Sequence, residues 1–169
     1  ENGFFHWLTW RDYQSWYPFG RDMHVVFPGV ALTAAVSYRI ISALGIQVSF
    51  LDYCIIFPAI MGTLTCLVIY FLGRDFGGKD VALFSSLFLA LNASHIGRTS
   101  LGWFDDETVG IFGFLLFFFL FLRSIEKERP LRNGLIYSIA AGLSLGWISA
   151  SWGAARYPLV MAALFVFIL

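Results

Sequence analysis

Long apolar runs separated by short polar segments dominate the chain from about residue 50 onward. Each run approaches the ~20 residues that an α-helix needs to cross the ~30 Å hydrocarbon core of a bilayer. Glycines and charged residues between the runs mark the loops. We predict transmembrane helices at about residues 50–73, 81–96, 108–122, 135–149 and 157–169, the last of which is truncated.

The first 48 residues have a different pattern. Residues 1–24 mix polar residues with many aromatic ones, which is typical of a segment at the membrane interface. Residues 27–44 are apolar, but Arg39 interrupts them and leaves fewer uncharged residues than a full span requires. We therefore predict that residues 1–48 form an external loop containing an amphipathic or re-entrant helix.

Basic residues in two short loops predict the orientation of the chain. Loops 73–80 and 123–132 both carry arginine and lysine, so the positive-inside rule places them in the cytoplasm. Loop 97–107 and the turn at residues 151–153 are each one predicted transmembrane helix away from these loops, so they lie on the opposite side of the membrane. We expect loop 97–107 to be an acidic loop on the extracytoplasmic (lumenal or extracellular) side of a multi-pass membrane protein.

The composition agrees with a lipid environment and excludes another class of protein. Hydrophobic residues make up 59% of the chain and charged residues 13%, against roughly 25% charged residues in a soluble domain. The formal net charge is zero, so no basic surface indicates nucleic acid as a partner. Membrane lipids are the expected surroundings. The chain starts without Met and stops within an apolar run, and we interpret it as an internal fragment.

The strongest candidate for chemistry is the acidic run Asp105-Asp106-Glu107 before an apolar helix. Ionised carboxylates are costly near hydrocarbon, and a divalent cation such as Mg²⁺ or Mn²⁺ would compensate them. If the run is extended, Asp105 and Glu107 point to one side and hold the metal, while Asp106 points away. Alternatively, the three acids only cap the helix and complement its dipole.

Three further residues lie on the same predicted side of the membrane. Arg98 could bind a phosphate, pair with the acids, or place its charge at the interface. Trp152 and Arg156 follow the next external turn, where aromatic and basic residues are common at a membrane boundary. All three stay candidate site residues because they lie on the same side of the membrane as the acidic run.

The order of several motifs resembles that of a known family. The segments WYPFGRD, FPG, RTSLGWFDDE and SASWG follow one another as in the catalytic subunit of oligosaccharyltransferase, and the similarity extends over essentially the whole chain. The pattern is most similar to archaeal and eukaryotic members, near their N-terminus. This resemblance implies the all-α, polytopic transmembrane helical bundle of a GT-C type glycosyltransferase.

The resemblance also implies an activity. Members transfer a glycan from a polyprenyl (dolichyl) phosphate or pyrophosphate carrier to the asparagine of Asn-X-Ser/Thr acceptors, with inversion and with Mn²⁺ or Mg²⁺. Asp105 and Glu107 match the second acidic motif, which supplies a metal ligand and a neighbouring catalytic acid. By the same resemblance Arg98 and Trp152 lie near the carrier phosphate, and with Arg156 of the same external turn they are the expected lipid-phosphate or substrate contacts. The expected partners are a lipid-linked oligosaccharide and an acceptor polypeptide.

Parts of the family pattern fall outside this sequence, and other functions stay open. The first acidic residue would precede Glu1, and a later glutamate and a WWDYG element would follow Leu169, so we expect the fragment to be inactive alone. One alternative is another polyprenyl-phosphate-dependent glycosyltransferase similar to protein O-mannosyltransferases. A second is a non-enzymatic transporter or channel with an acidic vestibule.

Overall fold

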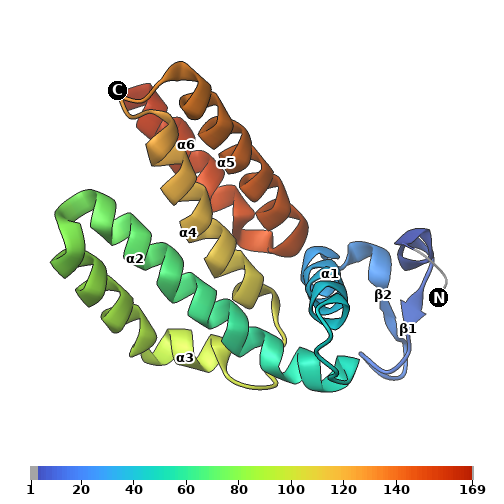
Figure 1. Cartoon of the computed structure of the whole chain (residues 1–169). Coiled ribbons are helices and arrows are strands. Elements are labelled where there is room, and N and C mark those ends of the chain that lie inside the picture. The colour runs from blue at the N-terminus through green and yellow to red at the C-terminus, as the bar shows by residue number, and fades with distance from the viewer. Residues whose placement is uncertain (1–3, 169) are drawn as a thin grey trace.

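The computed structural model describes residues 4–168 and consists of a small N-terminal region followed by a bundle of helices (Figure 1). Residues 1–3 of the predicted external loop and Leu169 of the last predicted helix lie outside the described residues. The N-terminal region contains η1 (Phe4–Leu8), β1 (Arg11–Asp12), β2 (Arg21–Asp22) and η2 (Met23–Val25). The two short strands pair antiparallel.

The helices that follow confirm the predicted fold class. They are α1 (Gly29–Ala43), α2 (Phe50–Ala90), α3 (Ala93–Thr99), α4 (Asp106–Ser124), α5 (Leu131–Ser151), η3 (Gly153–Ala155) and α6 (Arg156–Ile168). Within the described residues, α2, α4 and α5 are long and apolar enough to cross a membrane, and α1 and α6 are shorter apolar helices. Large apolar side chains such as Leu143 and Phe88 are about 70% exposed, as expected where lipid is the solvent.

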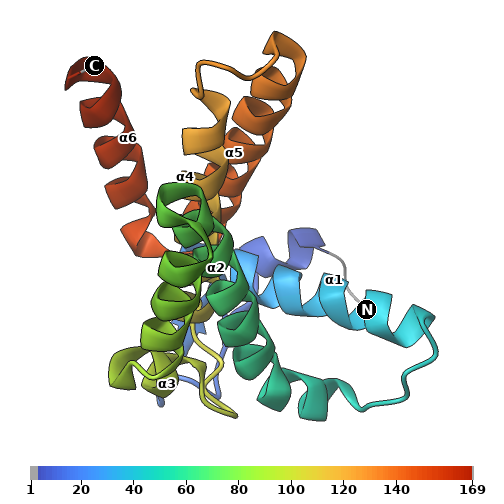
Figure 2. The ribbon, with the colours of Figure 1, turned by 60° about the vertical axis from the view of Figure 1, so that its left-hand side comes forward.

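Helix α2 is a hairpin of two arms that turns back on itself at Gly77-Gly78 (Figures 1 and 2). Gly78 has φ +74° and ψ −162°, a conformation essentially restricted to glycine. The arms pack closely because a Cβ atom at Gly73 would lie 3.1 Å from the Cα of Ala82. Ser86 Oγ donates a 3.0 Å hydrogen bond to the Cys66 carbonyl on the other arm. That each arm crosses the membrane stays a prediction.

Helices α4 and α5 share the most extensive contact between any two helices of the described chain, and small residues permit their approach. A Cβ atom at Gly113 would lie 2.5 Å from Cγ1 of Ile148, so only glycine fits there without a shift. Ser144 Oγ donates a 3.2 Å hydrogen bond to the Gly113 carbonyl. Such small residues and interhelical hydrogen bonds are typical of helices that pack in membranes.

Helix α1 lies within the segment predicted to be amphipathic or re-entrant, and it runs across the long helices rather than along them (Figure 2). Trp147 Nε1 donates a 2.8 Å hydrogen bond to Thr33 Oγ1 and so links α5 to α1. Tyr53 OH donates to Ser37 Oγ at 2.7 Å and links α2 to α1. These contacts bring the N-terminal region to the end of the bundle where α4 begins.

Candidate functional site

The acidic run lies where the loop after α3 becomes α4. Asp105 has an extended backbone, with φ −131° and ψ 165°, and its Oδ1 accepts a 2.8 Å hydrogen bond from the Asp106 backbone N–H. The Thr108 backbone N–H donates to the Asp105 carbonyl at 3.3 Å. Asp105 is therefore the N-cap of α4, and the positive end of the helix dipole favours the acids of its first turn.

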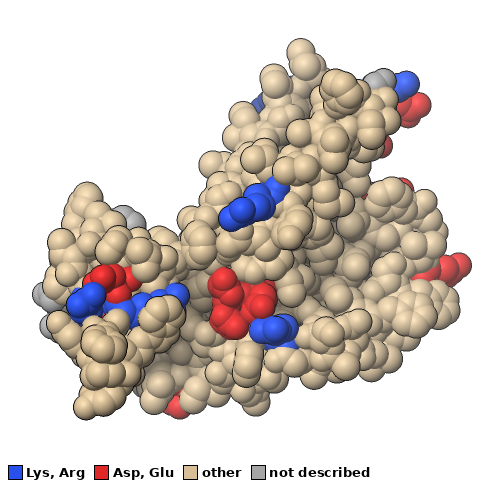
Figure 3. Space-filling model, turned by 180° about the vertical axis from the view of Figure 1, so that it is seen from behind, with Lys and Arg blue, Asp and Glu red and all other residues tan. Residues whose placement is uncertain are grey.

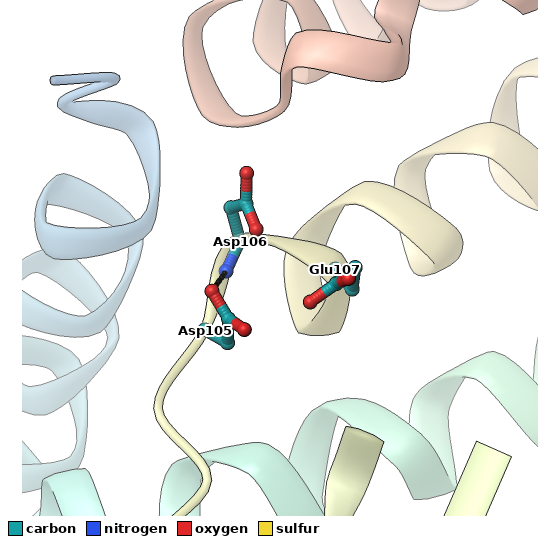
Figure 4. A group of neighbouring side chains, drawn as sticks. All are labelled: Asp105, Asp106 and Glu107. Atoms are coloured by element: carbon teal, nitrogen blue, oxygen red, sulfur yellow. Dashed lines mark hydrogen bonds between the residues drawn. The ribbon is translucent and has the colours of Figure 1, made fainter. Parts of the chain in front are cut away.

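The predicted extended geometry of the three acids is wrong, because the helix begins at Asp106. One carboxylate oxygen from each of the three residues lies within 4.8 Å of the other two, so Asp106 belongs to the group instead of standing apart from it. Figure 4 shows the Glu107 carboxyl turned toward Asp105, while Asp106 projects in another direction. The cap interaction and the cluster coexist, so the two interpretations of the sequence do not exclude each other.

Arg98 reaches this cluster from α3. Its Nη1 lies 3.1 Å from the Glu107 carboxylate and 3.7 Å from Asp105 Oδ2. Thr108, which is buried, holds the backbone of Arg98 by donating a 3.0 Å hydrogen bond to its carbonyl. Of the three possible roles of Arg98, pairing with the acids is the one that the contacts display. Phosphate binding by Arg98 stays a prediction.

The electrostatics of the cluster favour a cation. Three carboxylates and the single guanidinium of Arg98 leave a net charge of −2 when all are ionised. Partial burial acts to raise the pKa of Asp105, but the Asp106 backbone N–H, side-chain hydrogen bonds and the charge of Arg98 outweigh it and hold this pKa below its usual value. Figure 3 shows the acidic group on the surface with basic side chains on two sides. Clustered carboxylate oxygens fit the ligand preference of Mg²⁺ or Mn²⁺.

Trp152 and Arg156, the other predicted site residues, differ in how they relate to α4. The ring of Trp152 covers Gly110, where a Cβ atom would lie 2.5 Å from Cδ2 of the indole. Gly110 is three residues beyond Glu107, so the structure brings Trp152 to the acidic end of α4. Arg156 is exposed at the start of α6 and has no ion pair within residues 4–168.

A pocket of about 300 Å³ adjoins Asp105 and Asp106, and the sequence patterns did not reveal it. It is lined by residues of the N-terminal region, α1 and the loop before α4: Trp7, Arg21, Val26, Phe27, Val30, Ala31, Phe104, Asp105 and Asp106. The indole Nε1 of Trp7 is buried without a hydrogen-bond partner in the described chain. Arg21 stands in the WYPFGRD motif, which was the only signal that could have drawn attention to it.

The fold and the site define a multi-pass helical membrane protein with an acidic, cation-competent site at one end of its helices. The family described as oligosaccharyl transferase STT3, N-terminal, matches residues 1–169, and the chain belongs to this family. The family resemblance predicted from the sequence motifs is thereby confirmed.

Three relatives show the extent of the similarity. The chain is 30% identical to the dolichyl-diphosphooligosaccharide--protein glycosyltransferase subunit STT3B of Oryza sativa and 28% identical to that of Arabidopsis thaliana. It is 25% identical to the corresponding subunit stt3 of Schizosaccharomyces pombe. Each match covers 100% of this chain, which spans only 22–23% of the relative's length.

Proposed function

We propose that the full-length protein transfers a glycan from a polyprenyl (dolichyl) phosphate or pyrophosphate carrier to the asparagine of Asn-X-Ser/Thr acceptors, with inversion at the anomeric carbon. The observation that carries the proposal is the family match over the whole chain, together with the acidic cluster in the motif RTSLGWFDDE. The relatives bear the name of a dolichyl-diphosphooligosaccharide–protein glycosyltransferase subunit. Family membership favours this activity over an O-mannosyltransferase or a transporter.

In this proposal Asp105 and Glu107 hold Mg²⁺ or Mn²⁺. The metal, when bound, supplies a Lewis acid that neutralises negative charge on the carrier phosphate. The lowered pKa of Asp105 keeps its carboxylate ionised and able to accept a hydrogen bond from a substrate N–H group. An amide nitrogen is a weak nucleophile, so these side chains also contribute by positioning the acceptor amide through such hydrogen bonds.

In this proposal, the basic and aromatic residues around the acids bind the lipid carrier. Arg156 is exposed and carries an available charge at the acidic end of the bundle, where it suits a phosphate oxygen. Arg98 already lies 3.1 Å from Glu107, so its guanidinium can bridge this carboxylate and a phosphate. Trp152 shields the first turns of α4 and offers an aromatic surface beside them.

The site faces the extracytoplasmic side in this proposal. Cysteine labelling of the full-length protein, with Cys54, Cys66 and all its other cysteines replaced by alanine, tests this. A membrane-impermeant reagent applied from outside should label Ser100→Cys in the loop before α4. It should not label Lys127→Cys at the other end of α4. The reverse pattern would overturn the orientation.

The activity is tested by removing one carboxylate. Asp105→Asn keeps the size of the side chain but removes its charge, and we expect loss of glycan transfer to an acceptor peptide by the full-length protein. Asp80→Asn is the matched control because Asp80 is exposed in α2, near the turn of the hairpin. Normal transfer by Asp105→Asn, with both variants present in the membrane at equal amounts, would refute the assignment.

A further inference from the structure

A second pocket lies at the opposite end of α4 from the acidic cluster. It has a volume of about 320 Å³ and opens between the first arm of α2 and the end of α4. Arg123, in its wall, is 18 residues beyond Asp105, which corresponds to about 27 Å along a helix at 1.5 Å per residue. The pocket is therefore separate from the candidate catalytic site.

One arginine of this pocket is fully engaged. The guanidinium of Arg123 binds both carboxylate oxygens of Asp75, at 2.7 and 2.9 Å, and donates to Tyr137 OH at 3.3 Å. It also lies 4.4 Å above the ring of Phe119. Arg123 thus joins α2, α4 and α5 and forms a fixed wall of the pocket instead of a free binding group.

The other arginine, Arg129, has unused donor capacity. Its side chain is only 22% exposed, and its Nε is buried without a hydrogen-bond partner in the part of the chain that the structure describes. Its guanidinium lies 4.8 Å from the ring centre of Tyr137, which fixes its orientation. Its one ion-pair partner among the described residues is Glu126, whose side chain is 54% exposed and can turn into water.

The remaining walls suit a lipid. Leu72, Phe76 and Leu122 give the pocket an apolar side next to Asp75 and the two arginines. The adjoining turns at residues 73–80 and 123–132 contain six basic and four acidic residues, a net charge of +2. Basic pockets between the ends of transmembrane helices attract anionic headgroups.

We propose that this pocket binds the headgroup phosphate of an anionic phospholipid. The phosphate accepts hydrogen bonds from the guanidinium of Arg129 and displaces the Glu126 carboxylate, which becomes solvated. An acyl chain follows the apolar side formed by Leu72, Phe76 and Leu122. Each lipid bound here contacts both α2 and α4, so the lipid braces the two helices at this end.

The test is retention of lipid by the full-length protein, measured by native mass spectrometry from nanodiscs that contain phosphatidylserine and phosphatidylcholine. Arg129→Gln should weaken phosphatidylserine binding by about 10-fold or more, since it removes a charge-assisted contact. Arg132→Gln is the matched control, because Arg132 is an exposed arginine of the same turn that does not line the pocket. It should weaken binding by at most about 5-fold, the effect of one diffuse basic charge.

A second pair of variants predicts the opposite sign and so cannot be explained by misfolding. Glu126→Gln both releases Arg129 and removes an acidic charge, so it should tighten phosphatidylserine binding by about 10-fold or more, whereas Glu128→Gln removes only a diffuse acidic charge and should tighten it by at most about 5-fold. Equal effects within each pair would overturn the proposal, as would equal retention of phosphatidylcholine and phosphatidylserine. Competition by millimolar inorganic phosphate that removes the lipid preference would assign the pocket to free phosphate instead.

Discussion

Gly110 is the position where a single added carbon has the clearest predicted consequence. Its place on α4 is covered by the indole of Trp152, and a Cβ atom there would lie 2.5 to 2.6 Å from three ring atoms. The ring is rigid and half-buried, and the Trp152 backbone N–H is fixed by a 2.8 Å hydrogen bond to the Ile148 carbonyl. Gly110→Ala therefore forces Trp152 or the whole end of α5 to move.

The change in the free energy of unfolding caused by Gly110→Ala is the sum of two opposing contributions. Replacing a helical glycine by alanine stabilises a helix by about 1 kcal/mol, because glycine has the larger backbone entropy when unfolded. Overpacking a tight helix contact costs about 1 to 3 kcal/mol. We expect Gly110→Ala to lower the free energy of unfolding by up to about 2 kcal/mol. Gly142→Ala on α5, where a Cβ atom meets nothing within 4 Å, should be neutral or stabilising.

The assay is thermal unfolding of the full-length protein in detergent, together with glycan transfer. Gly110→Ala should unfold at a lower temperature than Gly142→Ala and should transfer less glycan, because the displaced indole no longer shields the first turns of α4. Trp152→Ala removes the ring that a Cβ atom at Gly110 would meet. The double variant should therefore lose less stability than the sum of the losses in Gly110→Ala and Trp152→Ala. Equal unfolding temperatures for Gly110→Ala and Gly142→Ala would refute the packing argument.

Three other predictions rest on single contacts. Thr108→Val should lower the free energy of unfolding by about 1 kcal/mol in chemical denaturation and raise the KM for the lipid-linked donor, because the carbonyl of Arg98 loses the hydrogen bond from the buried Thr108 hydroxyl. Trp147→Phe removes the N–H donated to Thr33 and should expose α1 to limited proteolysis, at a cost of about 1 kcal/mol. Gly78→Ala should destabilise the hairpin of α2 by about 1 to 3 kcal/mol in thermal unfolding, because alanine tolerates its positive φ poorly.

The helices of the bundle could be predicted largely from the apolar pattern, while their ends could not. The predicted helix 108–122 lies inside α4, which begins earlier because Asp105 supplies an N-cap. The loop predicted at residues 73–80 is mostly helical, and the chain turns only at Gly77-Gly78. Asp75 suggests a loop by its charge, but it pairs with Arg123, 48 residues later, and such a distant partner cannot be inferred from local pattern.

The candidate site could be predicted in part. The acidic run is visible because three consecutive carboxylates next to an apolar helix are costly in lipid. The contact of Arg98 with Glu107 depends on the relative orientation of α3 and α4. The number of residues between Arg98 and Glu107 does not determine this orientation. The pocket beside Asp105 depends on the β1–β2 pairing that carries Arg21, and no periodic pattern indicates strands of two residues.

The central claim is that Asp105 and Glu107 hold a divalent cation, and Mn²⁺ binding to the full-length protein tests it most directly. Titration followed by electron paramagnetic resonance should show one tightly bound Mn²⁺ in the wild-type protein and in Asp80→Asn. In Asp105→Asn and Glu107→Gln, each of which removes one charged ligand, the affinity should fall by at least about 10-fold. Mn²⁺ binding of unchanged affinity in these two variants would contradict the claim.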